Sequence, residues 1–139
     1  MAADYDRNDV ATLLAGMVDP VRLVFFTQTL ECETCLPTRQ ILDEIVAASD
    51  LVTLEEYNVL LDKEQVAAYG VTRPPTVAVV GATDVGIRFV GIPAGHEFRS
   101  LLDAILMVST NESGLSDAAR ELVAGIDRPT AIQVFVTPT

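Results

Sequence analysis

The chain has 139 residues, half of them hydrophobic, and a formal net charge of −11 at pH 7. This length is enough for one domain with a buried core. The negative charge argues against a nucleic-acid partner, because few cationic side chains are available to displace counterions from phosphates. No stretch reaches the about 18–20 consecutive apolar residues of a membrane span. The acidic start MAADYDRNDV is unlike a signal peptide. We therefore expect a cytoplasmic protein with no nucleic-acid or membrane partner.

Hydrophobic periodicity predicts the order of elements along the chain. The first half is predicted to contain a helix over 8–17, a strand over 21–27, a helix over 35–48, a strand over 52–60 and a helix over 62–69. The second half is predicted to contain strands over 77–80 and 85–90 and helices over 94–108 and 115–125. The first helix has Asn8 or Asp9 as its expected N-cap, and Gly70 is typical of a left-handed helix end.

Two of these elements carry further expectations about burial. The strand over 21–27 is a near-continuous apolar run, which predicts a strand buried on both faces. Asp43 and Glu44 are expected to face solvent on the helix over 35–48. The buried side of that helix is predicted to carry Leu36, Ile41, Leu42, Ile45 and Val46.

The cysteines of the chain form one motif, Cys32-Glu33-Thr34-Cys35, between the strand over 21–27 and the following helix. A strand leading into Cys-x-x-Cys at a helix start is typical of dithiol–disulfide chemistry. Residues three apart on a helical turn lie about 5–6 Å apart at Cβ, which suits a disulfide. The positive end of the helix dipole favours a thiolate on the first sulfur. We therefore predict Cys32 as the nucleophile and Cys35 as the resolving thiol.

Other interpretations of the two cysteines compete with this one. Buried inert thiols are one alternative, and half of a zinc site is another. A complete zinc site needs more ligands than two cysteines and one histidine supply. Two chains could also share their thiolates on a metal or iron–sulfur cluster. The flanking Glu31 and Glu33 are expected to tune the pair together with Thr34, because negative charge disfavours a thiolate; a solvated acidic face is the simpler interpretation.

Three further motifs carry a resemblance to a known family. Pro37 lies five residues after Cys32, and the segment from Gly70 to Thr76 reads GVTRPPT. Residues 86–98 read GIRFVGIPAGHEF. With these motifs the chain resembles the thioredoxin-like superfamily over nearly its whole length. Within it, the chain is similar to the tandem glutaredoxin-like protein disulfide oxidoreductases and to the N-terminal domain of the alkyl hydroperoxide reductase flavoprotein subunit.

The resemblance implies a thioredoxin fold: a central mixed four-stranded sheet flanked by helices, here with an extra N-terminal helix and a C-terminal helix plus strand. It also implies a cis bond at Pro75, with substrate binding beside the sulfurs at Pro74, Pro75 and Thr76. The chain departs from the thioredoxin pattern at three positions. Glu31 replaces a tryptophan, Phe26 replaces a buried acid, and Pro74 precedes the cis-proline.

The expected function is therefore a thiol–disulfide oxidoreductase that acts on protein disulfides. Cys32 attacks a substrate disulfide and Cys35 resolves the mixed disulfide, without a cofactor. A thioredoxin-reductase-like flavoprotein is the expected electron-transfer partner. The alternative is a non-catalytic adaptor unit of a larger redox protein whose active cysteines lie elsewhere.

Similarity between the two ends of the chain predicts a second unit. Residues 131–139, AIQVFVTPT, repeat the character of residues 22–30, RLVFFTQTL. We therefore expect residues 1–110 to form one thioredoxin-like unit. Residues 111–139 would then be a linker helix and the first strand of a truncated second unit. Such a strand needs a partner, so a homodimer through it is a further expectation.

Overall fold

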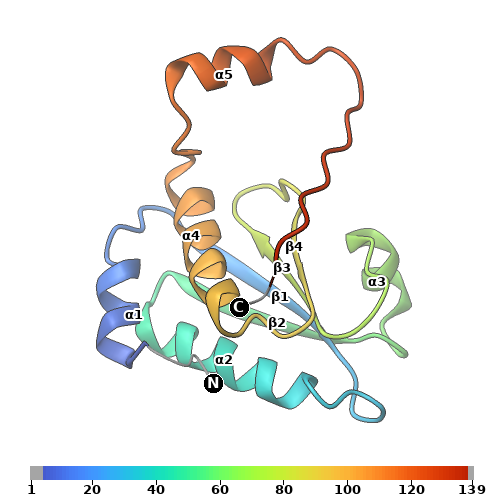
Figure 1. Cartoon of the computed structure of the whole chain (residues 1–139). Coiled ribbons are helices and arrows are strands. Elements are labelled where there is room, and N and C mark those ends of the chain that lie inside the picture. Colours follow the sequence, from blue (N-terminus) through green and yellow to red (C-terminus); the bar gives the residue numbers. More distant parts are fainter. Residues whose placement is uncertain (1–4, 138–139) are drawn as a thin grey trace.

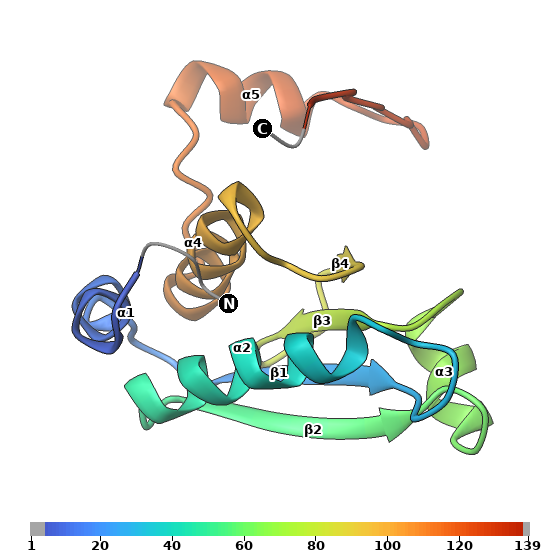
Figure 2. The same cartoon turned by 60° about the horizontal axis from the view of Figure 1, so that its bottom comes forward.

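The computed structural model describes residues 5–137 of the chain. Figures 1 and 2 show one compact body, and Figure 2 shows that the last helix and the segment after it stand clear of it. The body contains, in chain order, α1 (Arg7–Leu14), β1 (Val21–Thr27), α2 (Cys35–Ala48), β2 (Val52–Asn58), α3 (Lys63–Tyr69), β3 (Thr76–Val80), β4 (Ile87–Val90) and α4 (His96–Thr110). The last helix is α5 (Asp117–Ala124). No helix among the described residues has the length and apolar character needed to cross a membrane.

The four strands form a mixed sheet in the order β2-β1-β3-β4. Strand β1 pairs in parallel with β2 and antiparallel with β3, and β4 pairs antiparallel with β3. The carboxyl ends of β1 and β2 therefore meet the amino end of β3 at one edge of the sheet. Phe26 pairs with both Tyr57 and Thr76 there. We call this end of the strands the cysteine edge, because the loop that contains Cys32 begins at it.

Side chains alternate between two apolar cores on opposite faces of the sheet. The larger core lies between the sheet and helices α1, α2 and α4, and includes Leu23 and Phe25 of β1. The smaller core lies under α3 and includes Val24 and Phe26. All four side chains are fully buried, which confirms the prediction that β1 is covered on both faces. Figure 2 shows α1, α2 and α4 together on one side of the sheet.

Several predicted element boundaries need correction. The N-cap of α1 is Asp6, not Asn8 or Asp9. The Asp6 carboxylate accepts from the N–H of Asp9, and the Asp9 carboxylate accepts from the N–H of Asp6. This reciprocal capping box starts the helix before the expected position. Strand β4 begins at Ile87, because Asp84 turns the chain by accepting a hydrogen bond from the N–H of Gly86.

The burial of helix α2 is as predicted with one exception. Its bounds, Cys35–Ala48, match the prediction, and Ile41, Leu42 and Ile45 are buried. Leu36 was expected in the core but is 68% exposed. The buried positions of α2, which are Cys35, Thr38, Ile41, Leu42 and Ile45, repeat at intervals of three or four residues. Leu36 is out of step with this repeat, so its side chain lies on the solvent-facing side of the helix.

The C-terminal region departs further from the core. Helix α5 has the predicted N-cap, Ser116, whose hydroxyl accepts from the N–H of Ala119, and it ends at Gly125. Residues 126–137 form neither helix nor strand, although a strand was predicted over 131–139. Residues 138 and 139 lie outside the described residues. Without hydrogen-bonded neighbours, an apolar sequence of this length does not form a strand by itself.

An arginine joins three elements on the α3 face of the sheet. The Arg88 guanidinium donates to both carboxylate oxygens of Asp84, at 2.9 and 2.6 Å, and to the carbonyl of Tyr69 at 3.0 Å. It also lies 5.4 Å from the centre of the Tyr69 ring. These hydrogen bonds hold the pKa of Asp84 below its ordinary value. The arginine thereby ties α3 and the 84–87 turn to strand β4.

We expect this ion pair to make stability depend on pH in the acid range. The pKa of Asp84 is lower in the folded than in the unfolded chain, so the ionised carboxylate stabilises the folded state. This contribution to the free energy of unfolding is fully present above the unfolded pKa of about 3.9 and is lost as pH falls through the folded pKa. Asp84→Asn should lower the free energy of unfolding by about 0.5–1 kcal/mol at neutral pH and by progressively less toward about pH 3. Urea unfolding across that range measures the difference. The control is Asp103→Asn in the exposed Arg99–Asp103 pair; a constant Asp84→Asn difference at every pH contradicts the linkage.

Candidate active site

The two cysteines lie in the connection between β1 and α2. The side-chain amide of Gln28 donates to the carbonyl of Leu30 at 2.7 Å, which closes the turn before the first cysteine. Thr34 is the N-cap residue of α2, and its carbonyl accepts from both the N–H and the hydroxyl of Thr38, at 3.0 and 2.7 Å. Pro37 lies in the first helical turn, where its missing N–H is no loss. The strand end and the helix start therefore hold the cysteine loop from both sides.

Cys32 and Cys35 form a disulfide, with their Cα atoms 5.5 Å apart. Cys35 opens helix α2 and is buried, with 3% of its surface exposed. Cys32 lies in the loop just before the helix and is half-buried. A partner can therefore approach Cys32, whereas Cys35 is shielded by the protein. The roles of nucleophile for Cys32 and resolving thiol for Cys35 stay predictions.

The predicted substrate-binding segment lies at the same edge of the sheet. The Pro74–Pro75 peptide bond is cis, as predicted. Thr76 is buried, and its hydroxyl donates to the carbonyl of Arg73 at 2.7 Å. The carbonyl of Pro75 accepts from the N–H of Gly91 at 2.8 Å. Because Thr76 pairs with Phe26 near the end of β1, the segment lies beside the strand end that leads to the cysteines.

Pro74 contributes an unusual backbone to this edge. As a proline it has no N–H, and its carbonyl has no backbone partner among residues 5–137. The residue therefore offers a hydrogen-bond acceptor and no donor to anything that binds beside the sulfurs. An incoming strand would have to supply an N–H at this position.

The charges next to Cys32 are both negative. Glu31 and Glu33 are exposed, and neither forms an ion pair within the described part of the chain. Glu31 has a φ of 58°, a left-handed conformation that non-glycine residues rarely adopt. Farther along α2, Arg39 pairs with Asp43 and with Glu56 of β2 at 3.0 and 2.8 Å, so its charge is neutralised locally.

The structure separates other residues from the cysteines. Phe26, which stands where thioredoxins have a buried acid, packs against Tyr57 and Tyr69 in the smaller core, with ring centres 5.6 and 5.5 Å away. The Glu55 charge raises the pKa of Tyr57. His96 opens helix α4 and is exposed. Among residues 5–137, no three His, Cys, Asp or Glu side chains are grouped so as to hold a metal ion.

Sequence reasoning missed a set of exposed leucines around the cysteine loop. Leu30 is 76% exposed, and Leu36 is 68% exposed. The loop that follows β2 adds Leu60 and Leu61, which are 59% and 80% exposed. Both views of the fold place this loop next to the cysteine loop, and the N–H of Val59 donates to the carbonyl of Thr27 at 2.9 Å. The sequence did contain a signal for these exposed side chains: Leu30, Leu60 and Leu61 are apolar residues next to turns, where a buried position is not expected.

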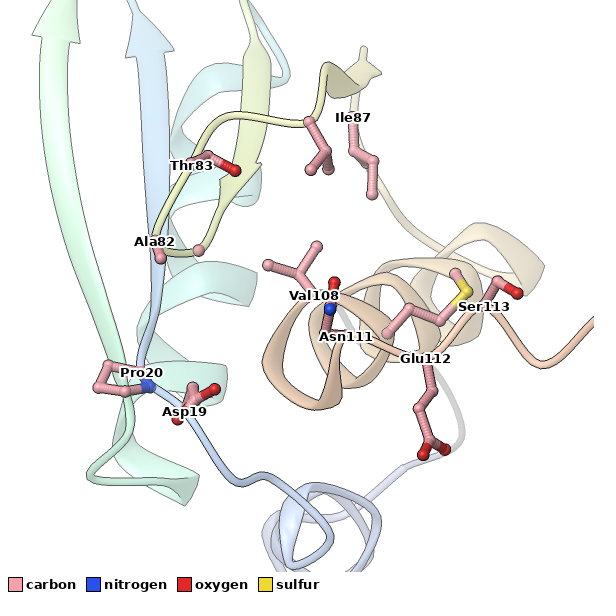
Figure 3. A pocket seen from close by; sticks show the side chains of 12 residues that line it. Asp19, Pro20, Ala82, Thr83, Ile87, Val108, Asn111, Glu112 and Ser113 are labelled. Carbon is pink, nitrogen blue, oxygen red and sulfur yellow. The ribbon is translucent and has the colours of Figure 1, made fainter. Parts of the chain in front are cut away.

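A cavity of about 930 Å³ lies at the opposite edge of the sheet from the cysteines (Figure 3). Its lining comes from the start of β1, the turn after β3 and the end of α4, and includes Asp19, Thr83, Ile87 and Val108. None of the predicted site residues lines it. The cavity therefore plays no part in chemistry at Cys32.

Comparison with known proteins identifies similar chains. No protein-family model matches the sequence. The AhpF protein of alkyl hydroperoxide reductase from Staphylococcus epidermidis is 31% identical over 101 residues, which cover 73% of this chain and 18% of that protein. The chain thus spans about a fifth of the length of this relative.

Solved structures agree with the sequence comparison. A protein disulfide oxidoreductase from Aeropyrum pernix K1 is 34% identical with a TM-score of 0.76, covering 86% of this chain and 53% of that chain. The NTD_N/C domain of alkyl hydroperoxide reductase AhpF from Enterococcus faecalis is 26% identical with a TM-score of 0.74, covering 83% of this chain and 56% of that chain. The predicted thioredoxin fold is confirmed. The fold, the Cys32–Cys35 pair and these relatives together show that the chain belongs to the thioredoxin-like superfamily.

Proposed function

We propose that this chain is a thiol–disulfide oxidoreductase of the glutaredoxin- and thioredoxin-like type, acting on protein disulfides. One observation carries the proposal: the two cysteines are bonded to each other, and only Cys32 is accessible. A structural disulfide would have no need for a partly exposed cysteine just before a helix. The likeness to a protein disulfide oxidoreductase over 86% of this chain supports the same chemistry.

The reaction starts from the reduced pair. The Cys32 thiolate attacks one sulfur of a substrate disulfide, the substrate S–S bond breaks, and the leaving thiolate takes up a proton. Cys35 then loses its proton and attacks Cys32 Sγ, which breaks the mixed disulfide and releases the second substrate thiol. The substrate gains two electrons and two protons, and the chain is left with the Cys32–Cys35 disulfide. Burial of Cys35 beside Cys32 favours resolution over attack on a second substrate molecule.

The proposed substrate contacts lie at Pro74, Pro75 and Thr76. An extended substrate segment would run along this part of the cysteine edge and donate a backbone N–H to the carbonyl of Pro74. Glu31, Glu33 and Thr34 would tune the reduction potential of the Cys32–Cys35 pair. Thr34 acts through its carbonyl, which anchors the first turn of α2 and so fixes the position of Cys35.

Turnover requires a reductant for the Cys32–Cys35 disulfide. We propose a thioredoxin-reductase-like flavoprotein, either as a separate protein or as another part of a longer chain. The similarity to alkyl hydroperoxide reductase AhpF supports a link to such a protein. We also propose a cytoplasmic location, because a reducing compartment keeps such a pair able to donate electrons.

The two thiols of the reduced chain should differ in reactivity. At neutral pH, Cys32 should be alkylated at least about ten times faster than Cys35, because only Cys32 combines exposure with proximity to the helix end. Mass spectrometry of partly labelled protein measures both rates. Cys32→Ser should abolish insulin reduction, whereas Cys35→Ser should accumulate mixed disulfides with substrate. Equal labelling, or turnover that survives Cys32→Ser, contradicts these roles of the two cysteines, whereas a wild-type chain that reduces no insulin favours the adaptor alternative.

The redox potential of the pair should be reducing. Glu31 and Glu33 repel the Cys32 thiolate, which destabilises the reduced form. We expect a potential nearer to about −270 mV than to about −120 mV by equilibration with glutathione. Replacing both glutamates by glutamine should raise the potential by about 20–30 mV. The control is Glu112→Gln with Glu121→Gln, an equal charge change on exposed residues beyond α4. An unchanged potential in the first variant refutes the tuning role.

We further propose that residues 111–139 belong to a second thioredoxin-like unit of a longer protein. Every described residue from 111 onward is exposed except Ala119. Ile132, Val134, Phe135 and Val136 expose 78–90% of their surfaces, which in water requires a covering partner. The solved relatives extend well beyond the matched region, since this chain covers 53% and 56% of them. The alternative is that the segment pairs with its copy in a homodimer.

Removing residues 129–139 should test this division of the chain. Because the described residues of this segment are all exposed, deletion should leave the midpoint of thermal unfolding and the alkylation rate of Cys32 unchanged. Light scattering should show reduced self-association, since four exposed apolar side chains are lost. An unfolded deletion variant would show that the segment belongs to the first unit.

A further inference from the structure

The charges at the cysteine edge are unevenly distributed. Glu31 and Glu33 adjoin Cys32 on both sides, and both carboxylates lie in solvent. The cations of this edge are the exposed Lys63 and Arg73, in the segments that open α3 and precede β3. The charges that adjoin Cys32 in the chain are therefore both negative.

Exposed apolar side chains occur in the segments near the same loop. The four exposed leucines described above come from the cysteine loop, the first turn of α2 and the loop after β2. Exposed leucines are ordinary when they are scattered. Here they come from the segments at the edge where the half-buried Cys32 lies. A partner can cover them while its own disulfide faces Cys32.

We propose that the site prefers protein disulfides in which the attacked cysteine is flanked by a lysine or arginine and by an aliphatic residue. This inference rests on the proposed function and adds its substrate class. The cation would lie between Glu31 and Glu33, and the aliphatic side chain would pack against Leu30 and Leu61. The negative net charge of the whole chain adds a weaker attraction of the same sign.

The range of this preference is short. At physiological ionic strength, charges more than about 8 Å apart are largely screened. Glu31 and Glu33 therefore act on residues immediately beside the attacked cysteine, and acidic residues elsewhere on the chain contribute little. The discrimination should weaken as salt is added.

Single-turnover reduction of short cystine peptides tests the preference. Two peptides are identical except that lysine in one replaces glutamate in the other, beside the same cysteine and leucine. The pre-reduced 139-residue chain is mixed with each, and the two protein thiols become a disulfide as the peptide disulfide becomes two thiols. We expect the lysine peptide to react about ten times faster at low salt, and less than about threefold faster at about 1 M salt.

Variants locate the source of the discrimination. Glu31→Gln with Glu33→Gln should bring the two rates within about twofold of each other. If these substitutions also change the reactivity of the Cys32 thiolate, the rates with the lysine and glutamate peptides change by the same factor, so the ratio of the two rates is unaffected. Glu112→Gln with Glu121→Gln changes the net charge equally and should keep the ratio. A third peptide with serine for leucine should react more slowly. Leu61→Ser should remove the rate difference between the leucine and serine peptides. Val18→Ser changes an exposed side chain at the opposite edge and should keep that difference.

The outcomes distinguish this inference from the proposed function. If the wild-type chain reduces none of the peptides, the proposed function itself fails. If it reduces the lysine and glutamate peptides at equal rates, the function stands and the charge preference is wrong. A loss of discrimination in the Glu112 and Glu121 variant would assign the effect to net charge and overturn the local role of Glu31 and Glu33.

Discussion

The burial of strand β1 on both faces is the constraint on which the rest of this structure depends. Its side chains enter two separate cores, so a shift by one residue would move every side chain to the opposite face and would turn the charged Arg22 toward the larger core. Its neighbours β2 and β3 fix its position from both edges. The chain therefore leaves the sheet at a defined point after Thr27, and the cysteine loop starts there. A rigid strand thus determines where a short, exposed loop places its sulfur.

The site combines elements of different rigidity. Cys35 and Thr38 belong to a helix that is packed against the larger core, and Thr76 belongs to a strand between two others. Cys32 and its glutamates lie in a turn that solvent reaches. Buried carboxylates beside a sulfur would need compensating partners, whereas exposed ones need none. The carboxylates of Glu31 and Glu33 can therefore act on the Cys32 sulfur without disturbing the core that positions Cys35.

Polar contacts inside the molecule connect segments that are far apart in sequence. The Ser109 hydroxyl, fully buried near the end of α4, accepts from the N–H groups of Val18 and Asp19 and donates to the carbonyl of Asp19. It thereby ties α4 to the turn that leads into β1. Arg88 has the same function on the other face, where it joins α3 to β4. Past the end of α4 the described residues are almost all exposed, and α5 stands apart (Figure 1).

Local sequence by itself determined the identity of the elements and the location of the redox motif. Periodicity predicted β1 and α2 with their observed bounds, because an apolar run and a helical repeat are properties of adjacent residues. Residue spacing likewise determined that Cys32 and Cys35 could form a disulfide. These features need no information from distant parts of the chain.

Only the tertiary structure decided which side chains are exposed and which segments meet. Leu36 is exposed because it lies opposite the buried positions Cys35, Thr38 and Ile41 on α2, and only the packing of those positions shows which side of the helix faces the sheet. Residues 131–137 have the composition of a strand, yet they form none because no neighbouring strand pairs with them. Nothing in the local pattern indicated that Leu60 and Leu61 lie beside the cysteine loop, or that Ser109 bonds to Asp19. Such contacts depend on strand order and register, which bring together residues that are separated by long stretches of chain.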